Sequence, residues 1–223
     1  IKQGSSRIPG IEVIEEADML FLFLRFVHPE DAWMEKLEGY LKRGGPVLGL
    51  RTTTHAFNGL KGKYAYHNYS YGGEEFVGGF GRNVLGETWN PRLGAGHYGN
   101  NHKYATAMHV VPKEKEHPIM RGVKDMHAMA GAYSARPMPN STILATNQVL
   151  DSMKVGAKPL EGKVPQPAAW VRTYKFQGGK EGRAFCSTQG ASEDILSEGV
   201  RRMIVNATLW CMKMEDHIKA DAD

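Results

Sequence analysis

The sequence predicts an α/β domain with a mostly parallel sheet, and three neighbouring segments carry this prediction. Residues 19–24 (Met-Leu-Phe-Leu-Phe-Leu) form a continuous apolar run of strand length, typical of a strand buried on both faces. Residues 29–44 have the spacing of a helix, and residues 46–50 are a second short apolar run. A strand, a helix and a strand in this order predict a βαβ unit whose strands are parallel neighbours.

The helix between these two strands has recognisable ends. Pro29 suits its first turn, and Glu30 and Asp31 complement the positive end of the helix dipole. Gly44 suits the C-terminal cap. Four large side chains fall on one face, which we expect to pack on the sheet: Trp33, Leu37, Tyr40 and Leu41.

After the second strand, the remaining elements alternate with long loops. Residues 59–99 are rich in glycine and aromatic residues, and we expect ordered loops there with one short helix near residues 74–84. Strands are expected at 107–111 and 143–145, and a hairpin joins 169–174 to 183–187. A final amphipathic helix carries apolar residues at helical spacing, namely Leu196, Val200, Met203, Ile204, Ala207 and Cys211.

Length and composition narrow the class of protein. The 223 residues suit one domain, with a core of about residues 8–214 and a polar tail at 215–223. The net charge is +4, but basic residues are scattered among acidic ones, so we expect no nucleic-acid partner. The sequence lacks an apolar stretch that could span a membrane, and its two cysteines exclude a disulfide framework and a cysteine-based zinc site.

The segment from Pro46 to Phe57 is built like a nucleophile elbow without a nucleophile. A short apolar strand runs into three threonines that read as the start of a helix, with a sharp turn between them. The residue at the apex is Arg51, where an elbow enzyme has Ser or Cys. A guanidinium stays protonated and cannot attack a carbonyl, so Arg51 is expected to bind or polarise a ligand.

Three further segments follow the elbow in a familiar order: residues 117–122 (His-Pro-Ile-Met-Arg-Gly), 167–170 (Pro-Ala-Ala-Trp) and 201–210. With them the chain resembles the trehalose-utilisation (ThuA-like) family of the class I glutamine amidotransferase-like superfamily, from about Ile8 to Met214. The resemblance implies a flavodoxin-like sheet with flanking helices. Family members usually start with a strand, a helix and a second strand before the point that corresponds to Ile1. We therefore expect N-terminal strands to be missing from this chain.

The chain departs from the family at two positions. Many members have histidine at the elbow apex, where this chain has Arg51, and histidine after the glycine that ends the late strand. Here Ala191 follows Gln189 and Gly190. The roles of those histidines do not carry over, but the resemblance implies a place in carbohydrate metabolism and a sugar or keto-sugar as the small-molecule partner.

The strongest candidate site residues end two consecutive strands. Arg25 and Arg51 are expected at the same edge of the sheet, where open parallel sheets bind ligands. They would bind one anion or polyol together; alternatively, each would pair with a carboxylate. His55 lies about one helical turn after Arg51 and is a candidate acid or base, or else a structural histidine.

The loops supply the remaining candidates. His97 is a second catalytic candidate, and Thr52, His102 and Gln189 are expected to bind substrate. Glu87 and Trp89 suit a sugar site, because an aromatic face stacks on the ring and a carboxylate meets hydroxyls; Trp89 as a loop anchor is the alternative. We expect no metal or cofactor, since the spacing of the loop histidines matches no metal-binding template.

These observations lead to one function and two alternatives. The sequence favours an enzyme that acts on a sugar or keto-sugar by acid–base chemistry, and glutamine amidotransferase activity is not expected without a nucleophile. A non-catalytic carbohydrate-binding or accessory module on a degenerate amidotransferase scaffold is the first alternative. A metal-dependent hydrolase that uses the loop histidines is the second. The oligomeric state stays open, with a homo-oligomer as one alternative.

Overall fold

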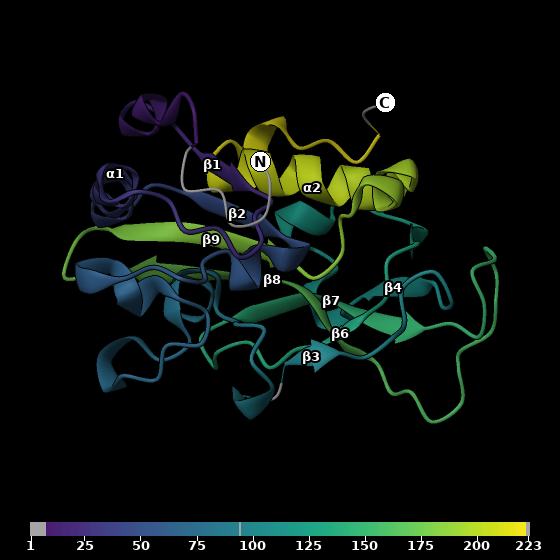
Figure 1. Ribbon diagram of the computed structural model, residues 1–223. Helices are drawn as coiled ribbons and strands as arrows, with labels where there is room; N and C mark the ends of the chain where they lie inside the picture. The colour runs from purple at the N-terminus through teal and green to yellow at the C-terminus, as the bar shows by residue number, and fades with distance from the viewer. Residues whose placement is uncertain (1–7, 94, 222–223) are drawn as a thin grey trace.

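A computed structural model describes residues 8–93 and 95–221 of the chain (Figure 1). In this part of the chain, seven strands form one sheet in the order β1-β2-β9-β8-β7-β4-β5, and β3 pairs with β6 in a separate ribbon. The strands are β1 (Leu20–Leu22), β2 (Val47–Leu50), β3 (Gly96–His97), β4 (Thr106–Val110), β5 (Met126–Ala128), β6 (Tyr133–Ser134), β7 (Thr142–Val149), β8 (Gln166–Lys175) and β9 (Glu181–Ser187). The α-helices are α1 (Asp31–Lys42) and α2 (Glu198–Cys211).

The predicted α/β class is confirmed, but the sheet is mixed rather than mostly parallel. β1, β2 and β9 are parallel, as the βαβ prediction requires for the first two. From β9 to β5 every neighbouring pair is antiparallel. The difference arises because β8 and β9 are joined by the tight hairpin that the sequence predicted, which reverses the chain direction in the middle of the sheet.

The two α-helices pack in two different cores, on opposite faces of the sheet. α1 packs its predicted face on Val47 and its neighbours, whereas α2 packs on Leu48 and Phe185. Side chains of successive β2 residues point to opposite faces of the sheet and pack in two different cores, so the whole strand is buried. No helix within 8–93 and 95–221 is both long and apolar enough to cross a membrane.

The first strand differs from its prediction. Residues 19–24 were expected to be buried on both faces, but β1 covers only Leu20–Leu22 and lies at the end of the sheet. Phe21 is 48% exposed and Phe23 53%. The apolar run is therefore an edge strand with one described neighbour, β2, and a continuous apolar sequence is not by itself evidence for burial on both faces.

Two helix predictions need adjustment. The short helix expected near 74–84 is a 3₁₀ turn at Glu74–Phe76 and a π-helical turn at Gly81–Leu85, separated by Gly78 and Gly79 with positive φ angles of 79° and 64°. The final helix starts at Glu198, so Leu196 lies in the preceding 3₁₀ turn and is 81% exposed. Of the predicted polar tail, residues 222 and 223 lie outside the described residues, as do residues 1–7.

Candidate functional site

The elbow predicted at Arg51 is present. β2 ends at Leu50, Arg51 has a φ of 48°, and a 3₁₀ turn begins at the same residue and runs to His55. A left-handed conformation is unfavourable for a residue with a side chain and is retained where surrounding contacts hold it. At the neighbouring strand, Phe26 has a φ of 50°. Two strained residues therefore follow the carboxyl ends of two adjacent parallel strands.

The Arg51 side chain is fixed by protein oxygens. It is 5% exposed, and its Nη1 donates to the backbone oxygens of Gly131 at 2.9 Å and Thr188 at 2.7 Å. The same atom lies 3.2 Å from Oε1 of Gln189. The guanidinium also lies over the ring of Tyr133, 4.5 Å from its centroid. Among the described residues it forms no salt bridge, so the predicted alternative of a carboxylate partner is not observed.

His55 lies inside an aromatic shell. Its ring centroid is 5.0 Å from that of Phe26 and 5.1 Å from that of Trp89, and Tyr69 and Tyr133 lie at 6.4 Å. Burial, followed by the positive charges of neighbouring arginines, lowers the pKa of His55 to about 3. The imidazole is therefore neutral at physiological pH and can accept or donate a hydrogen bond without carrying charge.

His97 reaches the same cluster from the β3–β6 ribbon. It pairs with Tyr133 in the ribbon, and its ring lies 5.5 Å from that of Tyr133 and 5.3 Å from that of Trp89. Unlike His55, it is exposed. Partial burial, followed by the charges of Arg51 and Arg25, lowers the pKa of His97. Of the two predicted catalytic histidines, His97 is therefore the one that can exchange a proton with solvent.

Arg25 stands at the outer side of this cluster. It is exposed, and its guanidinium lies 5.2 Å from the ring centroid of Phe26. Its charge lowers the pKa values of both His55 and His97. Both arginines therefore act on the same two histidines, with Arg51 buried and Arg25 exposed, and their joint binding of one ligand stays a prediction.

Two buried donors in this region lack hydrogen-bond partners among the described residues. One is Nε1 of Trp89, and the other is Nε2 of Gln189, whose side chain is fully buried. Buried N–H groups are nearly always paired with protein, water or a ligand. Both donors belong to residues that contact His55 or Arg51, so a ligand that brings oxygen atoms to this cluster would satisfy them. We call the residues Arg25, Arg51, His55, Trp89, His97, Tyr133 and Gln189 the strand-edge cluster.

Three predicted substrate-binding residues are not part of the strand-edge cluster. The hydroxyl of Thr52 donates to the backbone oxygen of Leu24 at 2.8 Å, so it ties the ends of β1 and β2 together. His102 is exposed and has a positive φ of 61° in the segment between β3 and β4. The ring and hydrogen-bond contacts of the strand-edge cluster do not include it.

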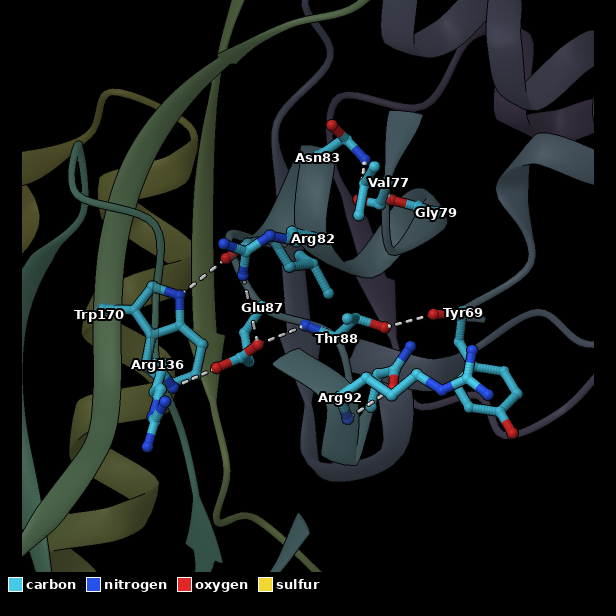
Figure 2. Close-up of polar contacts among 12 residues, drawn as sticks. Tyr69, Val77, Gly79, Arg82, Asn83, Glu87, Thr88, Arg92, Arg136 and Trp170 are labelled. Carbon is cyan, nitrogen blue, oxygen red and sulfur yellow. Dashed lines mark hydrogen bonds and ion pairs between the residues drawn. The ribbon is translucent and has the colours of Figure 1, made fainter. Parts of the chain in front are cut away.

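Glu87 is the third of these residues, and it is a loop anchor (Figure 2). Its carboxylate is 2% exposed and accepts hydrogen bonds from the backbone N–H groups of Thr88, at 2.8 Å, and Arg136. Nη1 of Arg82 lies 3.7 Å away. Burial raises the pKa of Glu87, and these donors oppose the increase. The carboxylate is therefore used within the protein, and its predicted contact with sugar hydroxyls has no support in this arrangement.

Asp194 is a residue that sequence reasoning missed. It is fully buried, and its carboxylate accepts backbone N–H bonds from Ala130, Gly190 and Ala191, each at 2.9 Å. Ala130 precedes one acceptor of Arg51, and Gly190 follows another. Asp194 therefore fixes the two segments that supply the acceptors of Arg51, one around Gly131 and one around Gln189. Its position in the first turn of the helix-like segment Ser192–Leu196 was the available signal.

The described residues contain no group of three or more His, Cys, Asp or Glu side chains that could hold a metal ion. His109, which shares its sequence region with the other loop histidines, lies on β4 and is exposed. Both cysteines are free and fully buried, Cys186 on β9 and Cys211 on α2. Burial raises the pKa of both thiols, for Cys211 to about 12.

Comparison with known structures agrees with this fold. The chain is 15% identical to a putative ThuA-like protein from Bacteroides uniformis, with a TM-score of 0.51 over 90% of this chain and 71% of the other. With a putative ThuA-like protein from Parabacteroides merdae the identity is 15% and the TM-score is 0.51, over 93% of this chain and 73% of the other. With a cytoplasmic protein from Salmonella typhimurium the identity is 13% and the TM-score is 0.53, over 92% of this chain and 76% of the other. These similarities show the fold alone.

No curated protein sequence matches the chain. The family model for ThuA, described as trehalose utilisation, matches residues 19–211 and so spans most of the chain. This range contains β1 to α2, including the elbow at Arg51 and the segment that holds it. The family to which the chain belongs is therefore the ThuA trehalose-utilisation family, as the order of its motifs predicted.

Proposed function

We propose that the protein binds a sugar or keto-sugar at the strand-edge cluster and acts on it by acid–base chemistry without a cysteine nucleophile. The family supports a role in carbohydrate metabolism linked to trehalose utilisation, and the substrate and the reaction are our proposal. The observation that carries it is the combination of aromatic rings with a fixed cation: Trp89 and Tyr133 surround His55, and Arg51 lies over Tyr133. Aromatic faces stack on sugar rings, and a cation polarises a carbonyl or hydroxyl oxygen.

Each residue has a distinct role in this proposal. Trp89 supports the sugar ring and donates its free Nε1–H to a hydroxyl, and Nε2 of Gln189 donates to a second one. Arg51 and Arg25 stabilise negative charge that develops on oxygen. His97 carries the proton, because it is exposed and its pKa lies below that of a free histidine, which favours a base over an acid at neutral pH. Neutral His55 positions Trp89 through ring contact.

The non-catalytic alternative uses the same cluster. Nη1 of Arg51 already has three protein acceptors, and both histidines are shifted toward the neutral form, which also suits a binding site. The alternative of a metal-dependent hydrolase has no support in the described residues, since no metal-binding group of side chains is formed there.

The proposal is tested by titrating the protein with trehalose and with fructose in isothermal calorimetry, and by following each sugar by NMR for conversion. We expect saturable binding of at least one sugar, and Trp89→Leu should weaken it by roughly tenfold or more, because ring contact and one hydrogen bond are lost. Trp210→Leu on α2 is the matched control. His97→Gln should abolish conversion while binding persists.

Binding without conversion by the unaltered protein would favour the accessory module. Absence of binding, or equal binding by Trp89→Leu, would show that the cluster is not the sugar site.

A further inference from the structure

A second cavity, of about 510 Å³, lies away from the strand-edge cluster. Its lining includes Arg172 and Lys175 on β8, Gln177 in the hairpin turn, and the aromatic residues Tyr66, Tyr71 and Phe76. Arg172 pairs with Ala184 and Lys175 with Glu181, near the turn of the β8–β9 hairpin. Two of the three residues that hold Arg51, Thr188 and Gln189, follow Ser187 at the opposite end of the same hairpin. The cavity is therefore a separate candidate site, of a size typical for a small molecule.

Arg172, which lines this cavity, lies beside a second arginine, Arg82. Arg172 is 8% exposed, and its Nη1 donates to the backbone oxygens of Arg82 at 3.1 Å and Asn83 at 2.9 Å. Its Nε is buried without a hydrogen-bond partner among the described residues. Burial, followed by the nearby charge of Arg82, lowers the pKa of Arg172, as expected for adjacent cations.

The nearest carboxylates leave donor atoms of these cations without a hydrogen-bond partner. Glu87 lies 3.7 Å from Nη1 of Arg82, but it also accepts two backbone N–H groups (Figure 2). Nη1 of Arg82 has no hydrogen-bond partner among the described residues. Lys175 is exposed and forms no salt bridge in the described part of the chain, and Glu75 contributes one carboxylate to the lining. Glu38, which accepts a hydrogen bond from Tyr66, is a third carboxylate near this cavity, so these cations and carboxylates are equal in number. What remains for a ligand is the unpartnered Nε of Arg172 and the ammonium of Lys175.

The aromatic part of the lining is held in place by contacts within the protein. The ring of Tyr66 stacks on His67 with centroids 4.3 Å apart and meets Phe76 edge-on at 5.0 Å. Its hydroxyl donates to Glu38 and accepts from Nε2 of Gln177 at 2.7 Å. A rigid aromatic wall suits the face of a small ring, and the polar groups at its rim can bond to hydroxyls.

We propose that this cavity binds a small hydroxylated ring that carries one oxyanion, a carboxylate or a phosphate. Arg172 and Lys175 receive the oxyanion, because an arginine fork and a lysine ammonium are the side chains best suited to it. Tyr71 and Phe76 contact the ring. This site is independent of the function proposed for the strand-edge cluster.

The test measures binding of glucose 6-phosphate, glucuronate, glucose and inorganic phosphate by isothermal calorimetry. We expect glucose 6-phosphate or glucuronate to bind saturably at this site and more tightly than glucose or phosphate alone, and the affinity should fall as salt is added. Lys175→Gln should weaken the binding of the charged sugar by roughly tenfold, because one charge-assisted hydrogen bond is lost. Lys180→Gln, in the turn of the same hairpin, removes an equal charge outside the cavity and should bind like the unaltered protein.

Arg172→Lys is the second variant and should also bind more weakly, with its fold checked by circular dichroism. Trp89→Leu in the strand-edge cluster should leave the binding of the charged sugars unchanged, which separates this proposal from the one above. Three results would overturn it: no binding of either charged sugar, equal weakening by Lys175→Gln and Lys180→Gln, or loss of binding in Trp89→Leu.

Discussion

Arg51 shows how a single residue can be structural and functional together. Its side chain connects the end of β2 to Gly131 and to Thr188, segments that lie 80 and 137 residues further along the chain. A buried charge is tolerated only when oxygen acceptors surround it. The contacts that fix the cation for a ligand therefore also stabilise the fold.

Replacing Arg51 by lysine should lower the free energy of unfolding by about 1–3 kcal/mol, because the shorter side chain cannot bring its ammonium to the position of Nη1 and loses the planar contact with Tyr133. Urea denaturation measures this change. Arg25→Lys, at the exposed arginine of the same edge, is the matched control and should change stability by no more than about 0.5 kcal/mol. Equal stability of both variants would contradict the role assigned to the Arg51 contacts.

His55 should make stability depend on pH. Its pKa is about 3 in the folded protein, below the ordinary value of 6.5. Between these two pH values the imidazole is therefore protonated in the unfolded chain and neutral in the folded protein. Stability is then fully present above the unfolded pKa and is lost as pH falls toward 3. Between pH 7 and pH 5 we expect the free energy of unfolding to fall by ~2 kcal/mol from this residue alone.

Urea denaturation at pH 7 and pH 5 provides the measurement. In His55→Gln the difference between the two pH values should shrink by that amount, since glutamine does not titrate. His109→Gln, which removes an exposed histidine on β4, should leave the difference unaltered. A slope in His55→Gln equal to that of the unaltered protein would exclude His55 as its source.

The part of the candidate site that the sequence predicts most directly is the part set by position along a strand. Arg25 and Arg51 follow parallel neighbours, so their shared edge follows from the βαβ unit. Thr52 and Glu87 looked equally suitable, yet their oxygen atoms bind backbone groups. Nothing in the sequence pairs Glu87 with Arg136, 49 residues away, because such contacts depend on how the loops pack. Tyr133 and Asp194 were missed for the same reason.

At the scale of elements, the segment around Asp194 is the support of the site. The 3₁₀ turn Ser192–Leu196 has few hydrogen bonds of its own. The carboxylate of Asp194 in this turn accepts from the backbone N–H groups of Ala130 and Gly190 and so connects the turn to two loops. The local patterns that predicted α1, β2 and the β8–β9 hairpin were sufficient because each pattern is contiguous. The direction of β7 and β4 in the sheet depends on how the long loops before them cross the molecule. The structure shows that both strands are antiparallel to their neighbours.

Asp194→Asn should destabilise the protein by roughly 1–3 kcal/mol, because the amide keeps one acceptor oxygen and turns an NH₂ group toward backbone donors. For a chain of this size the melting temperature should fall by about 2–4 °C per kcal/mol. Calorimetry or thermal fluorescence measures it. Glu193→Gln, the exposed neighbour, makes the same chemical change without these bonds and should melt within about 1 °C of the unaltered protein.

The two cysteines should be unreactive in the native protein, because both thiols are fully buried in packed elements and burial raises their pKa values. Addition of a thiol-reactive chromophore should label neither Cys186 nor Cys211 within minutes, whereas both should react at once in urea. Fast labelling of either residue without denaturant, accompanied by loss of sugar conversion, would restore a cysteine-based mechanism.

At the scale of the whole molecule, one sheet holds two candidate sites. The strand-edge cluster follows the carboxyl ends of β1, β2 and β9, and the cavity lined by Arg172 lies nearer the hairpin turn. The sites differ in charge as well as in place, since the first holds neutral histidines beside arginines and the second has cations with a wall of tyrosines. A neutral sugar and a charged sugar are therefore the ligands that distinguish them.

The edge position of β1 has a consequence for the behaviour of the protein at high concentration. Among the described residues the outer edge of β1 has no strand partner, so its N–H and C=O groups are open to pairing, and Phe21 and Phe23 add two apolar rings beside it. In a sample of residues 1–223, such an edge is a template onto which a second copy can add its own β1 and so extend the sheet across two molecules. We expect light scattering to show self-association that grows with protein concentration, and Phe21→Lys to suppress it, because a charge at the seam repels its counterpart in the approaching copy.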